Sequence, residues 1–180
     1  MKLRDYQIDC IDTIDAQPPG AYLAQMATGL GKTVTFANLP RHGKRMLILS
    51  HREELVEQPR KYFDCSFGVE RAALQSYDEE VVSASVQSLV RRLHRFRPDE
   101  FGLIICDEAH HAAANTYRKI FDHFTPDKLI GFTAKLCRVV INAEFHAQHF
   151  ARHGRNVVDH DAFLRVRDHR NGYLRQERRA

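Results

Sequence analysis

The stretch Ala21-Tyr22-Leu23-Ala24-Gln25-Met26-Ala27-Thr28-Gly29-Leu30-Gly31-Lys32-Thr33 passes from an apolar run into a glycine-containing loop. The run 21–26 has the length and apolarity of a buried strand, and the segment 32–39 has a helical pattern. Glycine permits backbone angles that side chains disfavour, so Gly29 and Gly31 let successive amide groups turn inward around phosphate oxygens. This stretch therefore predicts a strand, a phosphate-binding loop and a helix of an α/β fold.

Side chains of the loop extend this prediction to a bound nucleotide. Lys32 can reach the β- and γ-phosphates of ATP, and the hydroxyl of Thr33 can coordinate Mg²⁺. The strict glycine-loop pattern has a glycine where this chain has Met26, which leaves open a glycine turn with an incidental lysine. The other loop residues expected to line the cofactor site are Thr28, Gly29, Leu30 and Gly31.

Further apolar runs predict the rest of the sheet. Each is short and continuous, which is typical of strands buried on both faces, and helical patterns separate them. This alternation predicts a mainly parallel sheet with helices on both faces, whose ligands bind beyond the carboxyl ends of the strands. The expected strands are 45–50, 69–74, 80–85, 101–106 and 128–132, and the expected helices are 32–39, 52–63, 86–94 and 117–124.

Two adjacent carboxylates follow the apolar run 101–106. Asp107, at the carboxyl end of a buried strand, is placed to hold Mg²⁺, and Glu108 can polarise the water that attacks the γ-phosphate. In isolation the pair could equally be an acidic cap of the next helix. Because a glycine loop precedes it by about two strand–helix units, the pair favours the magnesium and catalytic interpretation.

The order of these motifs resembles the superfamily-two helicases and translocases, in the branch that includes restriction-enzyme motor subunits and DEAH-type DNA repair helicases. The resemblance covers residues 2–134 and includes an unbroken Asp107-Glu108-Ala109-His110 sequence. It implies a RecA-like P-loop NTPase domain. The resemblance also makes this domain one half of an ATP-dependent motor.

The resemblance assigns further roles around the nucleotide. Leu3-Arg4-Asp5-Tyr6-Gln7 is similar to the family's N-terminal glutamine motif, which makes Gln7 the residue that recognises adenine. Gly131-Phe132-Thr133-Ala134 begins the motif that couples the ATP site to strand movement, so Thr133 and Ala134 are the expected coupling residues. His110 is expected to connect that motif to the catalytic acids.

Two other segments resemble the motifs that contact nucleic acid. The segment 49–58 suggests that His51 and Arg52 lie near the backbone, and 83–89 suggests that Ser85 and Gln87 face it. The branch favours DNA over RNA as the partner. Without the resemblance, 52–63 could be the polar start of an amphipathic helix, and the serines could be ordinary polar positions of an edge strand.

Composition describes a soluble globular chain with a change near its end. The 180 residues carry a net charge of +4, with no apolar run long enough for a membrane span and no signal-peptide pattern. The four cysteines show no metal-ligand spacing, so reduced thiols and a cytoplasmic location are expected. Residues 136–180 contain nine arginines, no lysine and five acids, so the whole excess charge lies there.

The resemblance ends where Lys135-Leu136-Cys137 replaces the family's Thr-Pro continuation. We therefore expect an ATP-binding domain at 1–134 and an Arg/His-rich segment at 135–180, with no room for a second RecA-like domain or its arginine fingers. A frame-shifted end and a basic nucleic-acid arm are both open for 135–180. Two other functions also stay open: a non-catalytic ATP- and nucleic-acid-binding module, and a P-loop ATPase with no nucleic-acid role.

Overall fold

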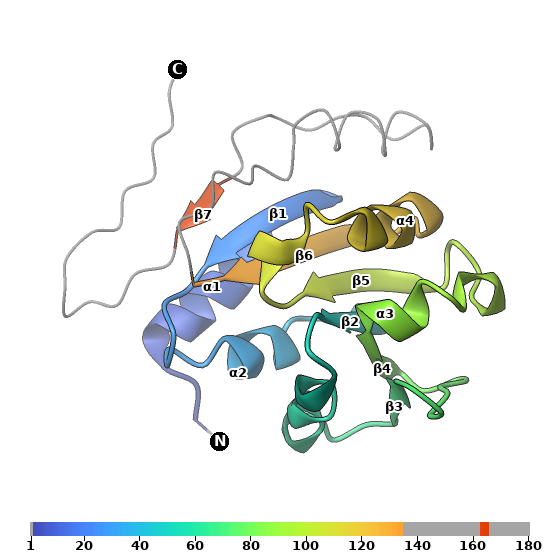
Figure 1. Cartoon of the computed structure of the whole chain (residues 1–180). Helices are drawn as coiled ribbons and strands as arrows, with labels where there is room; N and C mark the ends of the chain where they lie inside the picture. Colours follow the sequence, from blue (N-terminus) through green and yellow to red (C-terminus); the bar gives the residue numbers. More distant parts are fainter. Residues whose placement is uncertain (1, 135–162, 166–180) are drawn as a thin grey trace.

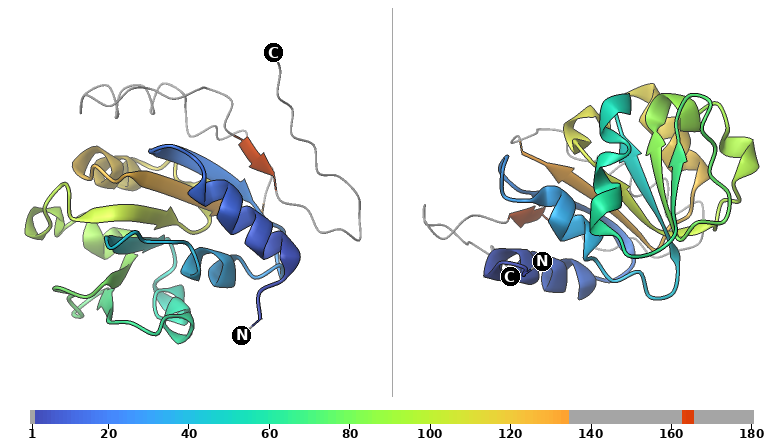
Figure 2. Two further views of the ribbon diagram at one scale, coloured as in Figure 1. Left: turned by 180° about the vertical axis from the view of Figure 1, so that it is seen from behind. Right: turned by 90° about the horizontal axis from the view of Figure 1, so that it is seen from below.

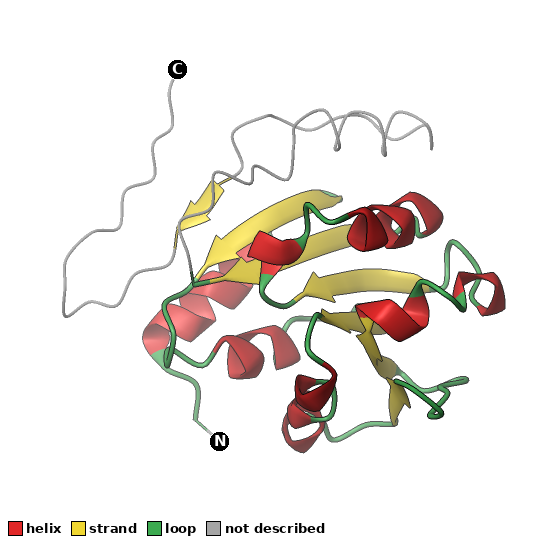
Figure 3. Cartoon of the chain, viewed as in Figure 1, coloured by secondary structure: helices red, strands yellow, loops and turns green. Residues whose placement is uncertain are grey.

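A computed structural model describes residues 2–134 and 163–165 of the chain. It contains one seven-stranded sheet with the order β3-β4-β2-β5-β6-β1-β7, in which every pair of neighbouring strands is parallel (Figures 1 and 3). The strands are β1 (Gly20–Gln25), β2 (Arg45–Ser50), β3 (Phe67–Glu70), β4 (Val81–Ser85), β5 (Phe101–Cys106), β6 (Lys128–Thr133) and β7 (Phe163–Arg165). The RecA-like α/β class expected from the sequence is confirmed.

Helices cover both faces of this sheet (Figure 2). In β2, Leu47 and Leu49 pack toward α3 and α4, whereas Met46 and Ile48 pack toward α1 and α2. A strand projects alternate side chains to opposite faces, so a continuous apolar run fills two cores at once. The α-helices are α1 (Asp5–Asp15), α2 (Lys32–Ala37), α3 (Val86–Leu89) and α4 (Asn115–His123), and the 3₁₀ helices are η1 (Glu53–Leu55), η2 (Gln58–Tyr62), η3 (Leu93–Arg95) and η4 (Ala109–His111).

The helix predicted over 52–63 is wrong. Two short 3₁₀ helices, η1 and η2, stand there instead. Pro59 has no amide hydrogen to donate and disfavours helical geometry at the residue before it, which explains the interruption. Val56 and Pro59 are buried, whereas most of the segment is exposed, so it presents no continuous apolar stripe to the core.

Other boundaries differ more modestly from prediction. The strand expected at 69–74 lies at Phe67–Glu70, and the helix expected at 86–94 divides into α3 and η3. Helix α1 was not predicted, although Tyr6, Cys10 and Ile14 recur at the spacing of a buried helical face. No periodicity predicts β7, which lies beyond the expected domain boundary and pairs with β1.

At the other edge of the sheet, a buried acid joins β3 to η3. Glu70 has no exposed surface, and its carboxylate pairs with Arg92 and Arg95. The amide of Ser76 also donates to Glu70, at 3.1 Å. These contacts secure an edge strand of four residues. In the described part of the chain, no helix is long and apolar enough to cross a membrane.

Candidate nucleotide and nucleic-acid sites

The predicted site residues follow the carboxyl ends of five neighbouring strands. The glycine loop follows β1, His51 follows β2, Gln87 follows β4, Asp107 follows β5 and Ala134 follows β6 (Figure 1). Carboxyl ends of parallel strands meet at one edge of the sheet, where ligands of such folds bind. The topology therefore brings motifs that are distant in sequence to one surface.

The glycine loop has the backbone that the sequence predicts. Gly29 and Gly31 have φ angles of +84° and +78°, in the left-handed region that glycine adopts without strain. A Cβ at Gly31 would lie 2.7 Å from Gln7 Nε2, so a side chain there would displace the Gln7 amide. Among the described residues, the amides of Gly31, Lys32 and Thr33 donate no backbone hydrogen bond, which leaves them able to donate to phosphate oxygens.

Gln7 is buried against this loop from α1. Its Nε2 donates to the carbonyl of Leu30 at 3.1 Å, and its Oε1 accepts from the amide of Arg4 at 3.0 Å. The hydroxyl of Tyr6 donates to the same Leu30 carbonyl at 3.0 Å. A side-chain amide has two donor hydrogens and two acceptor lone pairs, so Gln7 retains one of each. The remaining pair suits the edge of a purine base, as the adenine prediction requires.

Glu108 is the centre of the polar groups beside the loop. Its Oε1 lies 3.7 Å from Lys32 Nζ, and its Oε2 lies 3.1 Å from His110 Nδ1. Its backbone is left-handed, with φ of 53°, although glutamate rarely adopts this conformation. Strained backbone of this kind concentrates at active sites and switches, where it aims a side chain. The turn thus holds a carboxylate between a lysine and a histidine.

The groups around Asp107 do not offset the cost of burying its charge. Burial raises its pKa, and the neighbouring Glu108 carboxylate raises it further, against the opposing effects of the Glu108 amide, Lys32 and His110. The described residues contain no group of three or more His, Cys, Asp or Glu side chains able to hold a metal. Mg²⁺ bound with a nucleotide needs only one or two protein ligands beside phosphate and water oxygens. Asp107 and the half-buried Thr33 fit that requirement.

The end of β6 contacts both the start of the glycine loop and the turn that carries His110. The carbonyl of Thr133 accepts from the amide of Met26 at 2.9 Å, where the glycine loop begins. The hydroxyl of Thr133 lies 3.5 Å from His110 Nδ1, in the catalytic turn. Ala134 follows as a half-buried residue. Thr133 therefore contacts both the start of the glycine loop and His110.

The four candidate nucleic-acid residues lie together but differ in exposure. His51, Arg52 and Gln87 are exposed, whereas Ser85 is fully buried. The Ser85 hydroxyl donates to Gln87 Oε1 at 3.0 Å, and Gln87 Nε2 donates to the carbonyl of His51 at 3.1 Å. Ser85 thus orients Gln87, which carries the polar surface. Direct contact of Ser85 with a phosphate stays a prediction.

Comparison with known proteins assigns the family. Residues 1–138 match the family model described as "Type III restriction enzyme, res subunit". The "Putative ATP-dependent helicase IRC3" of Saccharomyces cerevisiae is 41% identical over 159 residues, which are 73% of this chain and 23% of that protein. This chain belongs to the type III restriction enzyme res-subunit family. By family it is an ATP-dependent helicase motor domain.

Two further comparisons extend the family assignment. The "Putative mitochondrial ATP-dependent helicase irc3" of Schizosaccharomyces pombe is 33% identical over 164 residues, covering 77% of this chain and 27% of that protein. The Sulfolobus solfataricus SWI2/SNF2 ATPase core in complex with dsDNA has the same fold, with a TM-score of 0.65 at 15% identity over 92% of this chain and 44% of that chain. This res-family chain spans about a quarter of the length of the curated relatives.

Sequence reasoning missed three residues of this res-family site. Tyr6 supports the Leu30 carbonyl, as described above, and its place beside Gln7 is the signal that could have indicated it. His111 and Tyr117 lie against His51, where the rings of His51 and His111 stack with centroids 4.4 Å apart. No spacing rule connects residue 51 with 111 and 117, because the contact depends on strand order.

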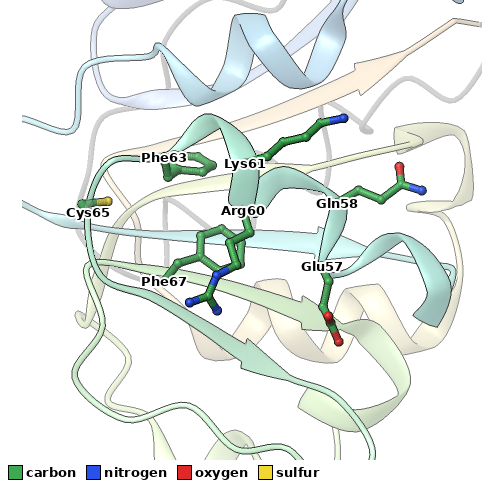
Figure 4. Close-up of a pocket in the computed structure, with 7 residues that line it drawn as sticks. All are labelled: Glu57, Gln58, Arg60, Lys61, Phe63, Cys65 and Phe67. Atoms are coloured by element: carbon green, nitrogen blue, oxygen red, sulfur yellow. The ribbon is translucent and has the colours of Figure 1, made fainter.

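A separate hollow lies beside the end of the segment 49–58, from which Glu57 and Gln58 line it. It has a volume of about 680 Å³ and lies between η2 and the start of β3 (Figure 4). Arg60, Phe63 and Phe67 are among its lining residues, and the two phenylalanine rings lie 5.5 Å apart. None of the predicted site residues lines it. The nucleotide surface is therefore distinct from this hollow.

Proposed function

We propose that this chain binds ATP with Mg²⁺ and hydrolyses it to drive movement on nucleic acid, with DNA favoured over RNA. The observation that carries the proposal is the convergence of Lys32, Glu108 and His110 beside a glycine loop with free amides. Phosphoryl transfer requires mainly positioning and charge stabilisation, and these groups supply both. The match to the restriction-enzyme res-subunit family supports the choice of DNA.

Each residue has a role that follows from its position. The loop amides and Lys32 hold the phosphates, while Thr33 and Asp107 would hold Mg²⁺, which neutralises charge that develops on the phosphate oxygens. Gln7 recognises adenine with its remaining donor and acceptor. Glu108 orients the attacking water and accepts its proton. His110 holds the Glu108 carboxylate and connects it to the hydroxyl of Thr133.

Nucleic acid would lie across the surface formed by His51, Arg52 and Gln87, next to the nucleotide. A second RecA-like domain would close the ATP site from the opposite side and supply an arginine to the transition state. Such an arginine contributes about 10³–10⁵ in rate in related enzymes. The described domain would supply the groups that bind the nucleotide, and the arginine of the second domain would raise the rate of turnover.

The deciding experiment is phosphate release by the purified chain, measured with and without duplex DNA. Turnover that DNA increases supports the motor. Nucleotide binding with no turnover under either condition supports a non-catalytic module. Turnover that is indifferent to DNA supports a P-loop ATPase without a nucleic-acid role and contradicts the proposal.

The expected cytoplasmic location stays part of this proposal. Cys10, Cys65 and Cys106 are free thiols, and burial raises the pKa of Cys10 to about 12. Thiols of this kind suit a reducing compartment. The mitochondrial name of the fission yeast relative makes imaging of the tagged protein the test.

A further inference from the structure

Three imidazole rings form a continuous row between the two candidate surfaces. The His51 and His111 rings are stacked, with centroids 4.4 Å apart and planes inclined by 17°. The His111 and His110 rings follow at 4.1 Å. His51 comes directly after β2, whereas the other two belong to η4, after β5. Side-chain packing thus connects two strand ends that neighbour each other in the sheet.

The two ends of this row reach residues with different predicted roles. At one end, the carbonyl of His51 accepts a hydrogen bond from Gln87, in the exposed group expected to face nucleic acid. At the other end, His110 Nδ1 lies 3.1 Å from the carboxylate of Glu108. His111 is the middle ring of the row and contacts both of the others. Its contacts with both neighbouring rings are therefore the feature that needs an explanation.

Tyr117 supports the row from the core. Its ring is nearly parallel to that of His51, with a 16° inclination and centroids 6.4 Å apart. The residue has no exposed surface, and its hydroxyl has no hydrogen-bond partner among the described residues. Burial and the nearby acidic groups raise its pKa, so the hydroxyl stays protonated. This buried ring from α4 therefore limits the movement of His51, on which His111 stacks.

The turn that carries these histidines contains the strained residue of the site. Glu108, which precedes η4, has the left-handed backbone described above. A residue held in a sparsely populated conformation can change state for a small change in its surroundings. Coupling between sites requires such an element, whose balance both ligands can shift. Displacement of the His111 ring would act directly on this turn.

We propose that His111 is a positioning residue that couples the nucleic-acid surface to Glu108, by stacking on His51 and on His110. The inference rests on the proposed function and deepens it. Nucleic acid that contacts the His51 segment fixes the first ring, His111 transmits that constraint, and His110 sets the Glu108 carboxylate. Coupling of this kind is reciprocal, so nucleotide in the glycine loop also changes the environment of His51.

The test measures the dissociation constant of a non-hydrolysable ATP analogue with Mg²⁺, without and with a short DNA duplex, on the full chain. DNA tightens nucleotide binding about fivefold or more in the wild type, the low end of usual allosteric coupling. His111→Ala brings this ratio to about one. His111→Phe, which retains a stacking ring, keeps most of the ratio. His94→Ala, an exposed histidine in η3, is the matched control and keeps all of it.

A second readout needs no DNA. The ring signals of His51 in an NMR spectrum shift when the nucleotide analogue binds to the wild type, and they do not shift in His111→Ala. The coupling is overturned if DNA tightens nucleotide binding in His111→Ala as much as in the wild type and the His51 signals of this variant still shift when the analogue binds. The proposed function stands in that case. Failure of the wild-type chain to bind nucleotide overturns the proposed function, and the coupling with it.

Discussion

Two clusters of charged side chains in this domain differ in how completely the protein satisfies them. At the β3 edge, Glu70 is fully buried and pairs with Arg92 and Arg95, and Ser76 donates to it from both its amide and its hydroxyl. The nucleotide cluster lacks this balance. There Glu108 lies 3.7 Å from a lysine and 3.1 Å from a histidine, and the adjacent Asp107 forms no ion pair with the described residues.

The difference separates structural charge from functional charge. A buried carboxylate that its own protein supplies with donors holds elements together, and removal of one partner leaves an uncompensated charge. A carboxylate whose environment disfavours its ionised form is a candidate for ligand binding or catalysis. Asp107 is in the second class, because burial and Glu108 both raise its pKa. Substitutions at the two clusters should therefore affect different measurements.

The largest effect is expected from Glu108→Gln. The amide keeps the shape of the side chain but cannot accept a proton, so DNA-stimulated phosphate release should fall by about 10²–10⁴. Nucleotide affinity and the free energy of unfolding should change little. Steady-state phosphate release and titration with an ATP analogue give both numbers. A variant that turns over at the wild-type rate would remove Glu108 from the mechanism.

Lys32→Ala should remove most nucleotide binding. Loss of a charged hydrogen bond to phosphate costs about 1.5–3 kcal/mol, equivalent to about 10–150-fold in affinity. Fluorescence titration with an ATP analogue measures the change. Lys44→Ala is the matched control, because Lys44 is exposed and pairs with Asp127 away from the glycine loop. Equal affinities for Lys32→Ala and the wild type would contradict the site assignment.

Glu70→Gln should affect stability and leave the nucleotide unaffected. The substitution removes the charge that Arg92 and Arg95 share, and both arginines are partly exposed, so we expect a loss of about 2–3 kcal/mol in the free energy of unfolding. Urea denaturation measures it. Glu80→Gln, an exposed partner of Arg41, should cost less than about 1 kcal/mol. A change in nucleotide affinity in Glu70→Gln, once folded, would erase the contrast between the clusters.

Asp107→Asn should have the smallest effect and the opposite sign. In the free chain it removes a disfavoured charge, so the free energy of unfolding should rise by about 0.5–1 kcal/mol. The pKa of Asp107 is raised in the folded state, so the ionised carboxylate lowers the free energy of unfolding, and this loss is fully present above the folded-state pKa. The cost disappears as the pH falls toward the unfolded value near 4. The difference between variant and wild type should thus be present at pH 7 and absent near pH 4 in urea titrations without Mg²⁺.

The sequence predicts well what depends on local pattern. The strands 45–50 and 101–106 lie where the apolar runs place them, and the glycine loop has the positive φ angles expected of Gly29 and Gly31. Continuous apolarity indicates burial on both faces, and this sheet has two cores. These features follow from a few neighbouring residues, so they need no knowledge of the rest of the fold.

Features that depend on long-range contacts could not be predicted. The row of His51, His111 and His110 requires β2 and β5 to be neighbours, which the sequence pattern does not specify. The left-handed backbone at Glu108 has no signal in a residue type that normally avoids it. The burial of Ser85 is a similar case, because it depends on β4 lying between β3 and β2 in the sheet.

The order of the strands also has a consequence for folding during synthesis. Strand β1, which leads into the glycine loop, pairs along its whole length with β6, and β6 begins only at Lys128. Ribosomes add about 5–20 residues per second, so on the order of 5–20 s pass between the synthesis of β1 and that of β6. The strand that leads into the glycine loop is therefore made well before the neighbouring strand that encloses it. Nucleotide binding by a nascent chain would therefore report that the sheet has closed around β1.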